Sequence, residues 1–292
     1  MSELNSRHRR VTDRIERRAR SRAFSNGVLD EETNFPMVRI GKVHVHSLSI
    51  DDAIESILTR VRSGRGGYVV TPNVDHICFA DHDPEFRAAY RHSFLSLPDG
   101  QPVLWMAKAL GVPLVEKISG SDLIRPLLEM ASSQGCTVFF LGASEETCAE
   151  AARRLEASIP DLRIGGWASP YFDPDGETSG LDSAFEKIRA QQPDLILIAM
   201  GTPKQEQLML RYYETLAPAV AIGIGAGLDF IAGKVPRAPR WMSRYGLEWL
   251  FRLSREPGRM WRRYLVRDRA IFKIFLRTRR EAARRALRGV EQ

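Results

Sequence analysis

The chain has 292 residues, of which 43% are hydrophobic and 27% charged, so it is neither disordered, nor collagen-like, nor a small disulfide-stabilised protein. Its length fits one domain of roughly 200 residues with additional segments. No apolar run reaches the roughly 18 residues of a membrane-spanning helix, and the three cysteines form no disulfide framework or metal clip. Because no apolar segment follows the arginine-rich start, we expect a protein of a reducing, cytoplasmic compartment.

Basic residues concentrate at the two ends of the chain, although the formal net charge is only +7. The first 22 residues contain eight arginines against three acidic residues, and residues 237–288 contain sixteen arginines and one lysine against four acidic residues. The segment between them carries a net negative charge. We therefore expect a disordered basic arm over 1–35, a core over 36–236 and a basic helical appendage over 237–292.

The expected appendage also contains three of the five tryptophans, Trp241, Trp249 and Trp261. Aromatic rings mixed with arginine are typical of a lipid headgroup interface, where each suitably placed basic residue adds about 1 kcal/mol of attraction to anionic lipid. This pattern predicts a peripheral protein on an anionic membrane surface. Two alternatives are open: basic ends also bind nucleic acid, although no nucleic-acid-binding motif is visible, and a homo-oligomer would bury the aromatic face.

The core alternates between helical and strand patterns. Ser49 and Asp52 have capping-box spacing before apolar residues of helical period, which predicts a helix that ends near 64–67. Short apolar runs predict strands over 68–71, 94–97, 136–141, 195–200 and 220–224. Helical patterns predict helices over 101–110, 121–134, 145–157, 182–191 and 204–215, the second of them capped by Ser121 or Asp122.

The expected strands are apolar throughout, which is typical of parallel strands covered on both faces. The sequence therefore predicts an α/β fold, a Rossmann-like parallel-sheet sandwich. Ligands of such sheets bind beyond the carboxyl ends of the strands, so we look for binding residues in the segments that follow each strand. Those segments contain Thr71, Asn73, Asp75, Asp99, Gly142, Gly201, Lys204, Gln205, Glu206 and Gly225.

Two glycine turns have the character of phosphate sites. Gly142 and Gly201 each precede an expected helix, whose first N–H groups bind phosphate well, and two such loops suit a nucleotide diphosphate. Either turn is equally explained as a tight connection between a strand and a helix. The glycines at 223, 225 and 227 lack the full dinucleotide fingerprint, so a nicotinamide-dependent oxidoreductase is only weakly indicated.

Polar residues after the first two expected strands have equally plain alternatives. Asp99 lies where a carboxylate would face the crevice, but Pro-Asp-Gly is also a common turn sequence. Thr71, Asn73 and Asp75 have a capping role as their alternative, at the start of the next helix.

Metal chemistry is not indicated. Asp173-Pro174-Asp175 has the form of a metal-binding Asp-x-Asp, but it lies in a loop rich in proline, glycine and aspartate, so we interpret it as a solvated turn. The histidines and cysteines show no zinc-binding spacing. We expect no metal and no cofactor.

Several motifs occur in the order and spacing of a known family. They are Thr71-Pro72-Asn73 with Asp75, Leu97-Pro98-Asp99-Gly100, Gly120-Ser121-Asp122, the run 201–206, Arg237-Ala238-Pro239, Gly246-Leu247-Glu248-Trp249, Arg252-Leu253 and Glu256-Pro257-x-Arg259. Together they resemble the WecG/TagA/CpsF glycosyltransferases, glycosyltransferase family 26, over about residues 38 to 266.

This resemblance implies an inverting, metal-independent transferase with a GT-E type core. Such an enzyme moves a sugar from a UDP-sugar to a polyprenyl-diphosphate-linked saccharide at the cytoplasmic face of the inner membrane, in bacterial surface or exopolysaccharide biosynthesis. N-acetylmannosamine, its uronic acid and glucose all fit as the transferred sugar. A different class is also open: a catalytically silent scaffold or nucleic-acid-binding protein with a Rossmann-like body.

The resemblance also implies roles for single residues. By motif match, Asp99 would be the catalytic base, Thr71 would position substrate, and Gln205 would contact the donor. The basic appendage would supply the guanidinium groups that meet the diphosphate, from Arg252, Arg259 and Arg262.

Overall fold

The computed structural model describes residues 27–30, 33–173, 178–239, 242, 247–255, 257–262 and 269–289. Most of the expected N-terminal arm, 1–26 and 31–32, lies outside these residues, as does part of the Asp173-Pro174-Asp175 turn.

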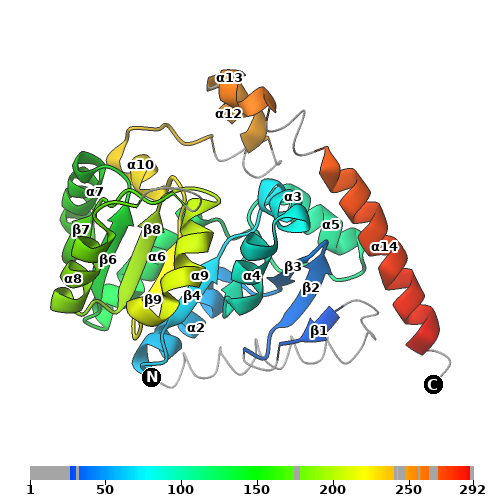
Figure 1. Cartoon of the computed structure of the whole chain (residues 1–292), viewed down its shortest axis with the longest axis horizontal. Coiled ribbons are helices and arrows are strands. Elements are labelled where there is room, and N and C mark those ends of the chain that lie inside the picture. The colour runs from blue at the N-terminus through cyan, green and yellow to red at the C-terminus, as the bar shows by residue number, and fades with distance from the viewer. Residues whose placement is uncertain are drawn as a thin grey trace.

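The centre of the protein is a six-stranded parallel sheet (Figure 1). Its strands are β4 (Gly67–Val70), β5 (Leu95–Ser96), β6 (Thr137–Gly142), β7 (Arg163–Ala168), β8 (Leu195–Ala199) and β9 (Val220–Gly223). Their order in the sheet is β5-β4-β9-β8-β6-β7, so β4 and β9 lie next to each other although they are far apart in the sequence. The expected Rossmann-like α/β fold is confirmed. Strand β7 was not expected, because its Gly-Gly-Trp sequence interrupts the apolar run that marks the others.

Helices cover both faces of this sheet (Figure 1). One face carries α2 (Ile50–Arg62), α6 (Gly120–Ser133), α7 (Glu145–Ser158) and α10 (Gly227–Ala232). The other carries α3 (Val74–His82), α4 (Pro84–His92), α5 (Gln101–Ala109), α8 (Leu181–Gln191) and α9 (Lys204–Leu216). Helix α2 begins with the expected capping box, in which Ser49 and Asp52 bind each other's backbone N–H groups.

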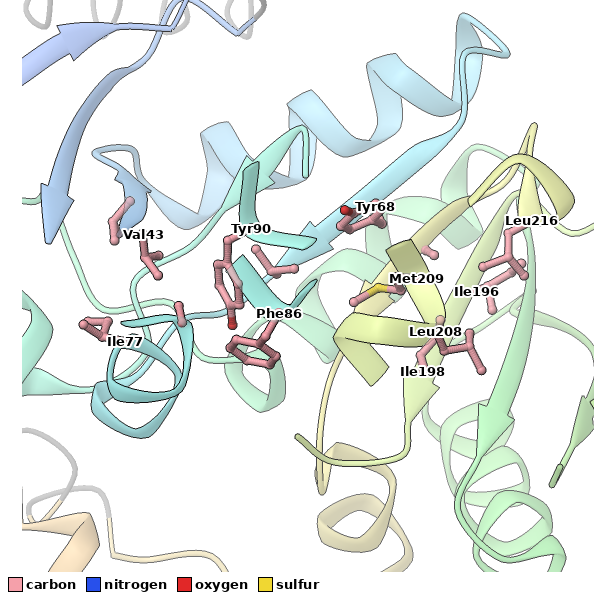
Figure 2. Close-up of a cluster of buried hydrophobic side chains, with 14 of the residues drawn as sticks. Val43, Tyr68, Ile77, Phe86, Tyr90, Ile196, Ile198, Leu208, Met209 and Leu216 are labelled. Carbon is pink, nitrogen blue, oxygen red and sulfur yellow. The ribbon is translucent and has the colours of Figure 1, made fainter. Parts of the chain in front are cut away.

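Successive strand residues supply two separate cores. Ile196 and Ile198 of β8 face α9, whereas Leu195 and Leu197 face the α6 and α7 side, and all four are fully buried. Figure 2 shows the first of these cores, with Leu208 of α9 beside the β8 isoleucines. Burying an aliphatic side chain of this size contributes about 1.5–3 kcal/mol. A strand with apolar side chains on both faces gains this stabilisation on both faces only where helices cover both sides of the sheet.

A second, antiparallel sheet was not expected. It consists of β1 (Gly27–Leu29), β2 (Pro36–Ile40) and β3 (Val43–His46), and β1 falls within the range assigned to the arm. Alternating residues of β2 and β3 are fully buried in the α9-side core, namely Val38, Ile40, Val43 and Val45. Burial of an apolar residue at every second position is the pattern typical of a strand with one buried face.

Three helices form the C-terminal part: α12 (Glu248–Arg255), α13 (Pro257–Arg262) and α14 (Ala270–Gly289). Helix α14 packs along one side of the protein, against β2 and α3 (Figure 1). Ile274 is buried there, and the Thr278 hydroxyl accepts a 2.9 Å hydrogen bond from the Gly41 N–H. Arg39 of β2 pairs with Glu281, and Asp81 of α3 pairs with an α14 arginine.

The division of the chain into arm, core and appendage stays a prediction. Across the described helices, none is long and apolar enough to cross a bilayer.

Candidate active site

A cavity of about 400 Å³ lies at the carboxyl ends of β5, β4, β9 and β8, the four neighbouring strands at one side of the sheet. Ligands of parallel sheets bind at this edge because the loops after the strands converge there. The cavity is lined by Thr71, Asn73, Asp75, His76, Asp99, Ser119, Gly120, Ser121, Met200, Gly201, Thr202, Gln205, Ile224, Gly225, Ala226, Phe230 and Glu248. Seven residues expected from sequence are thus brought together.

Asp99 reaches the cavity because the segment after β5 runs alongside the segment after β4 and is hydrogen-bonded to it. The Leu97 N–H donates to the Val70 carbonyl at 2.8 Å, and the Asp99 N–H donates to the Pro72 carbonyl at 3.0 Å. Gly100 then turns the chain with φ +94°, a left-handed conformation that favours glycine. The Pro-Asp-Gly turn therefore exists, and it also places a half-buried carboxyl group on the cavity wall.

The segment after β4 supplies the neighbouring part of the wall. Thr71 and Asp75 are each less than a tenth exposed. Asn73 has the capping role that the alternative interpretation gave it, since its Oδ1 accepts from the His76 N–H at 3.3 Å at the start of α3. Capping and cavity lining are compatible here, because a helix that starts at a strand end directs its first turn toward the ligand space.

The loops after β8 and β9 form the floor and are joined by Gln205. Its Oε1 accepts from the Gly225 N–H at 3.0 Å, and its Nε2 donates to Glu206 at 2.8 Å. A Cβ atom at Gly223 would lie only 2.9 Å from Gln205 Nε2, so glycine is needed for this close approach. Gln205 thus lines the cavity while both ends of its amide bind protein groups, and its contact with the donor stays a prediction.

Three of the residues expected from the segments after the strands lie outside the lining. Gly142 ends β6, one strand beyond the cavity, and a Cβ there would lie 2.8 Å from the Ala199 carbonyl, so its glycine serves the contact between β6 and β8. Lys204 extends over the Tyr171 ring at 4.9 Å. Glu206 is fully buried beneath the floor.

The N-terminus of α6 closes the cavity on another side. Ser119 caps this helix, not the expected Ser121 or Asp122: its hydroxyl accepts from the Asp122 N–H at 3.1 Å and donates to the Asp122 carboxylate. Gly120 lies so close to β9 that a Cβ would approach the Ile224 Cα to 2.9 Å. The backbone of α6 can thus contact the end of β9 directly.

The comparisons with known proteins agree with this arrangement. The model of the "Glycosyl transferase WecG/TagA/CpsF family" matches residues 38–285, which is most of the chain and includes every segment around the cavity. The chain belongs to the WecG/TagA/CpsF glycosyltransferase family. It is therefore a glycosyltransferase, and the family match favours this class over a scaffold or an oxidoreductase.

Two relatives of this glycosyltransferase carry the same name, N-acetylglucosaminyldiphosphoundecaprenol N-acetyl-beta-D-mannosaminyltransferase. The protein of Bacillus spizizenii is 34% identical over 207 residues, which cover 71% of this chain and 78% of the relative. The protein of Bacillus subtilis is 30% identical over 200 residues, which cover 68% and 75%. The expected role in exopolysaccharide synthesis finds no support in these names.

The glycosyltransferase places helix α12 next to the cavity, since Glu248, the first residue of α12, lines it. Arg252 lies on α12, and Arg259 and Arg262 lie on α13, but their side chains lie outside what the structure describes. Their role toward diphosphate therefore stays a prediction.

Several lining residues were not predicted from the sequence. His76, Thr202, Met200 and Phe230 were not singled out for the site. The spacing of His76, three positions after Asn73 on the same helix, is a signal that it shares the Asn73 face. No group of three or more His, Cys, Asp or Glu side chains suited to a metal ion occurs within the described ranges.

Lys117 joins α12 to the core of the glycosyltransferase. Its Nζ donates to Asp122 at 2.7 Å and to Glu248 at 3.4 Å. Burial lowers the pKa of Lys117, but the hydrogen bond to Asp122 and the charges of Asp122, Glu248 and Asp99 outweigh burial and raise it above its ordinary value. The ammonium group is therefore a fixed positive charge near a cavity that Asp75, Asp99 and Glu248 line.

We expect Lys117→Met to loosen α12. Loss of this half-buried ion pair costs about 1–2 kcal/mol, so backbone amides of 248–255 should exchange with deuterium roughly tenfold faster. Mass spectrometry of exchanged peptides measures this. Lys234→Met is the matched control, since Lys234 pairs with Glu146 on α7, away from α12. Equal exchange of 248–255 in both variants would contradict the prediction.

Proposed function

We propose that this glycosyltransferase moves N-acetylmannosamine from a UDP-sugar to N-acetylglucosamine linked through diphosphate to a polyprenyl lipid. The observation that carries the proposal is the cavity at the strand ends, where Asp99 and Thr71 meet within a chain of this family. The acceptor and the sugar are those named for both Bacillus relatives.

The proposed reaction is a single displacement with inversion. Asp99 takes the proton from the attacking hydroxyl of the acceptor, a new bond forms at the anomeric carbon, and the bond from that carbon to the UDP oxygen breaks on the opposite face. One well-placed carboxylate suffices as the base. UDP leaves with additional negative charge, which guanidinium groups and helix-terminal N–H groups stabilise. We propose that Arg252, Arg259 and Arg262 supply the guanidinium groups, and that no metal ion takes part.

The proposed place of action is the cytoplasmic face of the inner membrane, as a peripheral protein. Helix α14 supports it: Phe272 is 72% and Leu276 is 51% exposed, among exposed Lys273, Arg279 and Arg280. Trp249 on α12 and Trp261 on α13 are also more than two fifths exposed. Exposed aromatic and basic residues on amphipathic helices bind anionic interfaces. A homo-oligomer that covers these side chains stays a prediction.

A donor screen tests the proposal. Purified protein is mixed with a short-chain lipid-diphosphate N-acetylglucosamine and, separately, with UDP-N-acetylmannosamine, its uronic acid form, UDP-glucose and UDP-N-acetylglucosamine. Mass spectrometry should find extension by one N-acetylmannosamine residue. Extension by a different sugar would revise the donor, and no extension with any UDP-sugar would refute the assignment.

Liposomes test the membrane part. We expect the protein to sediment with vesicles that contain anionic lipid and to stay in the supernatant with neutral vesicles, because the attraction is electrostatic. Donor hydrolysis without acceptor, compared with and without vesicles, tests whether activity depends on the membrane; equal rates would count against that dependence.

A further inference from the structure

A chain of hydrogen-bonded polar side chains runs from the cavity lining into the interior of the protein. The Tyr90 hydroxyl lies 2.7 Å from His76 Nδ1, and Thr202 Oγ1 lies 2.6 Å from His76 Nε2. Thr202 Oγ1 also donates to Glu206 Oε1 at 3.5 Å. Tyr90, His76 and Glu206 are each at most 5% exposed. The chain therefore connects α4, α3, the loop after β8 and α9.

Glu206 ties this chain to the second glycine loop. Its Oε1 accepts a hydrogen bond from Gln205 Nε2, and Gln205 Oε1 in turn accepts from the Gly225 N–H. The Gln205 amide is therefore held in one orientation: its nitrogen donates to the Glu206 carboxyl group, and its oxygen accepts from Gly225. The floor of the cavity thus depends on the position of one buried carboxyl group.

The surroundings of the second carboxyl oxygen of Glu206, Oε2, favour the protonated acid over the carboxylate. Glu206 Oε2 is buried and has no hydrogen-bond partner within the part of the chain that the structure describes. A buried ionised oxygen without a donor is costly. The charge of Asp75 on α3 acts on Glu206, and Glu206, Asp75 and Asp99 all act on the Tyr90 hydroxyl of α4. His76 is joined to Glu206 through Thr202. Burial, with the charge of Asp75 adding to it, raises the pKa of Glu206 to about 7, against smaller opposing effects of its hydrogen bonds.

We propose that Glu206 is a positioning residue that holds the cavity floor as the neutral acid, and that its ionisation weakens binding of the anionic donor. The inference rests on the proposed function. Asp75, Asp99 and Glu248 already line the cavity, so a fourth negative charge beneath the floor repels a diphosphate further. The Thr202 and Gln205 hydrogen bonds reach only Oε1, so on ionisation Oε2 stays buried without a donor.

The test is the pH dependence of the donor KM. UDP-N-acetylmannosamine is the probe, because its diphosphate is a diester whose charge does not change between about pH 5.5 and 8.5. The wild-type KM should rise about tenfold as pH passes through 7, whereas Glu206→Gln, which has the shape of the neutral acid, should keep a low KM throughout. Glu186→Gln, on the exposed face of α8, is the matched control and should retain the wild-type profile.

Urea unfolding provides a second measurement that needs no substrate. A folded-state pKa of about 7 lies above the ordinary 4.5, so the stabilisation from neutral Glu206 is complete below pH 4.5 and is lost as pH rises through 7. The stability of wild type relative to Glu206→Gln should therefore fall across this window and then level off. If Glu206→Gln does not fold, Asp75→Asn should move the KM inflection to lower pH, because it removes a charge that raises the Glu206 pKa.

An inflection near pH 7 that persists in Glu206→Gln would overturn the inference, as would a stability difference that does not change with pH. A wild-type protein that transfers no sugar at any pH would instead refute the proposed function, and the inference about donor binding with it. The two failures are therefore distinguishable.

Discussion

Asp99→Asn should lower kcat by about 10²–10⁴-fold, since loss of a general base removes about this much rate. Asparagine keeps the size and the backbone hydrogen bond to Pro72, so the turn and the cavity wall should be retained. The donor KM should change little, because the base acts on the acceptor hydroxyl. Steady-state transfer to the short-chain acceptor measures both constants.

The control for this variant is Asp182→Asn, an equal loss of charge on the exposed first turn of α8. It should have wild-type kcat. A kcat of Asp99→Asn within a few-fold of wild type would remove Asp99 from the reaction, and a parallel loss of thermal stability would show that the effect is structural.

Arg259→Gln combined with Arg262→Gln should produce the second large effect. Charge-assisted hydrogen bonds contribute about 1.5–3 kcal/mol each, so loss of two lowers kcat/KM by about 10²–10⁴-fold if both stabilise the departing diphosphate. The loss should appear with a soluble short-chain acceptor, where membrane binding plays no part.

Arg279→Gln combined with Arg280→Gln supplies the matched control. These arginines are exposed on α14, and the double variant removes the same total charge. With the soluble acceptor it should stay within a few-fold of wild type, while its binding to anionic vesicles weakens. Similar losses for both pairs would indicate a general charge effect and would contradict a specific diphosphate contact.

Much of the sheet could be predicted from the sequence because central parallel strands need apolar side chains on both faces. The runs that end at Val70, Ala199 and Gly223 have this character, and each is a strand close to its expected bounds. Strands β2 and β3 were missed because they follow a different rule: their buried apolar side chains occur at every second position, and Gly41 turns the chain between them with φ +63°.

The site was predictable only in part, because its residues come from strand ends whose neighbours depend on sheet order. Gly142 and Gly201 look alike in the sequence, as small residues between a strand and a helix. Gly201 ends up in the cavity and Gly142 outside it, because β8 pairs with β9 whereas β6 lies on the far side of β8. Similarly, Gln205 and Glu206 are adjacent, but successive helical residues point about 100° apart, so one lines the floor and the other lies beneath it.

By itself, the sequence determined the class of fold, the helix starts that rely on local capping, and the family motifs that carry Thr71 and Asp99. These features depend on residues close together along the chain or on a pattern repeated in each strand. Only the tertiary structure decided which strand ends meet, how α14 lies against β2, and that Glu206 joins a buried chain from Tyr90 to Gly225. Those features depend on contacts between separate elements, such as β4 with β9, Gly41 with Thr278 and His76 with Thr202, and no local pattern encodes them.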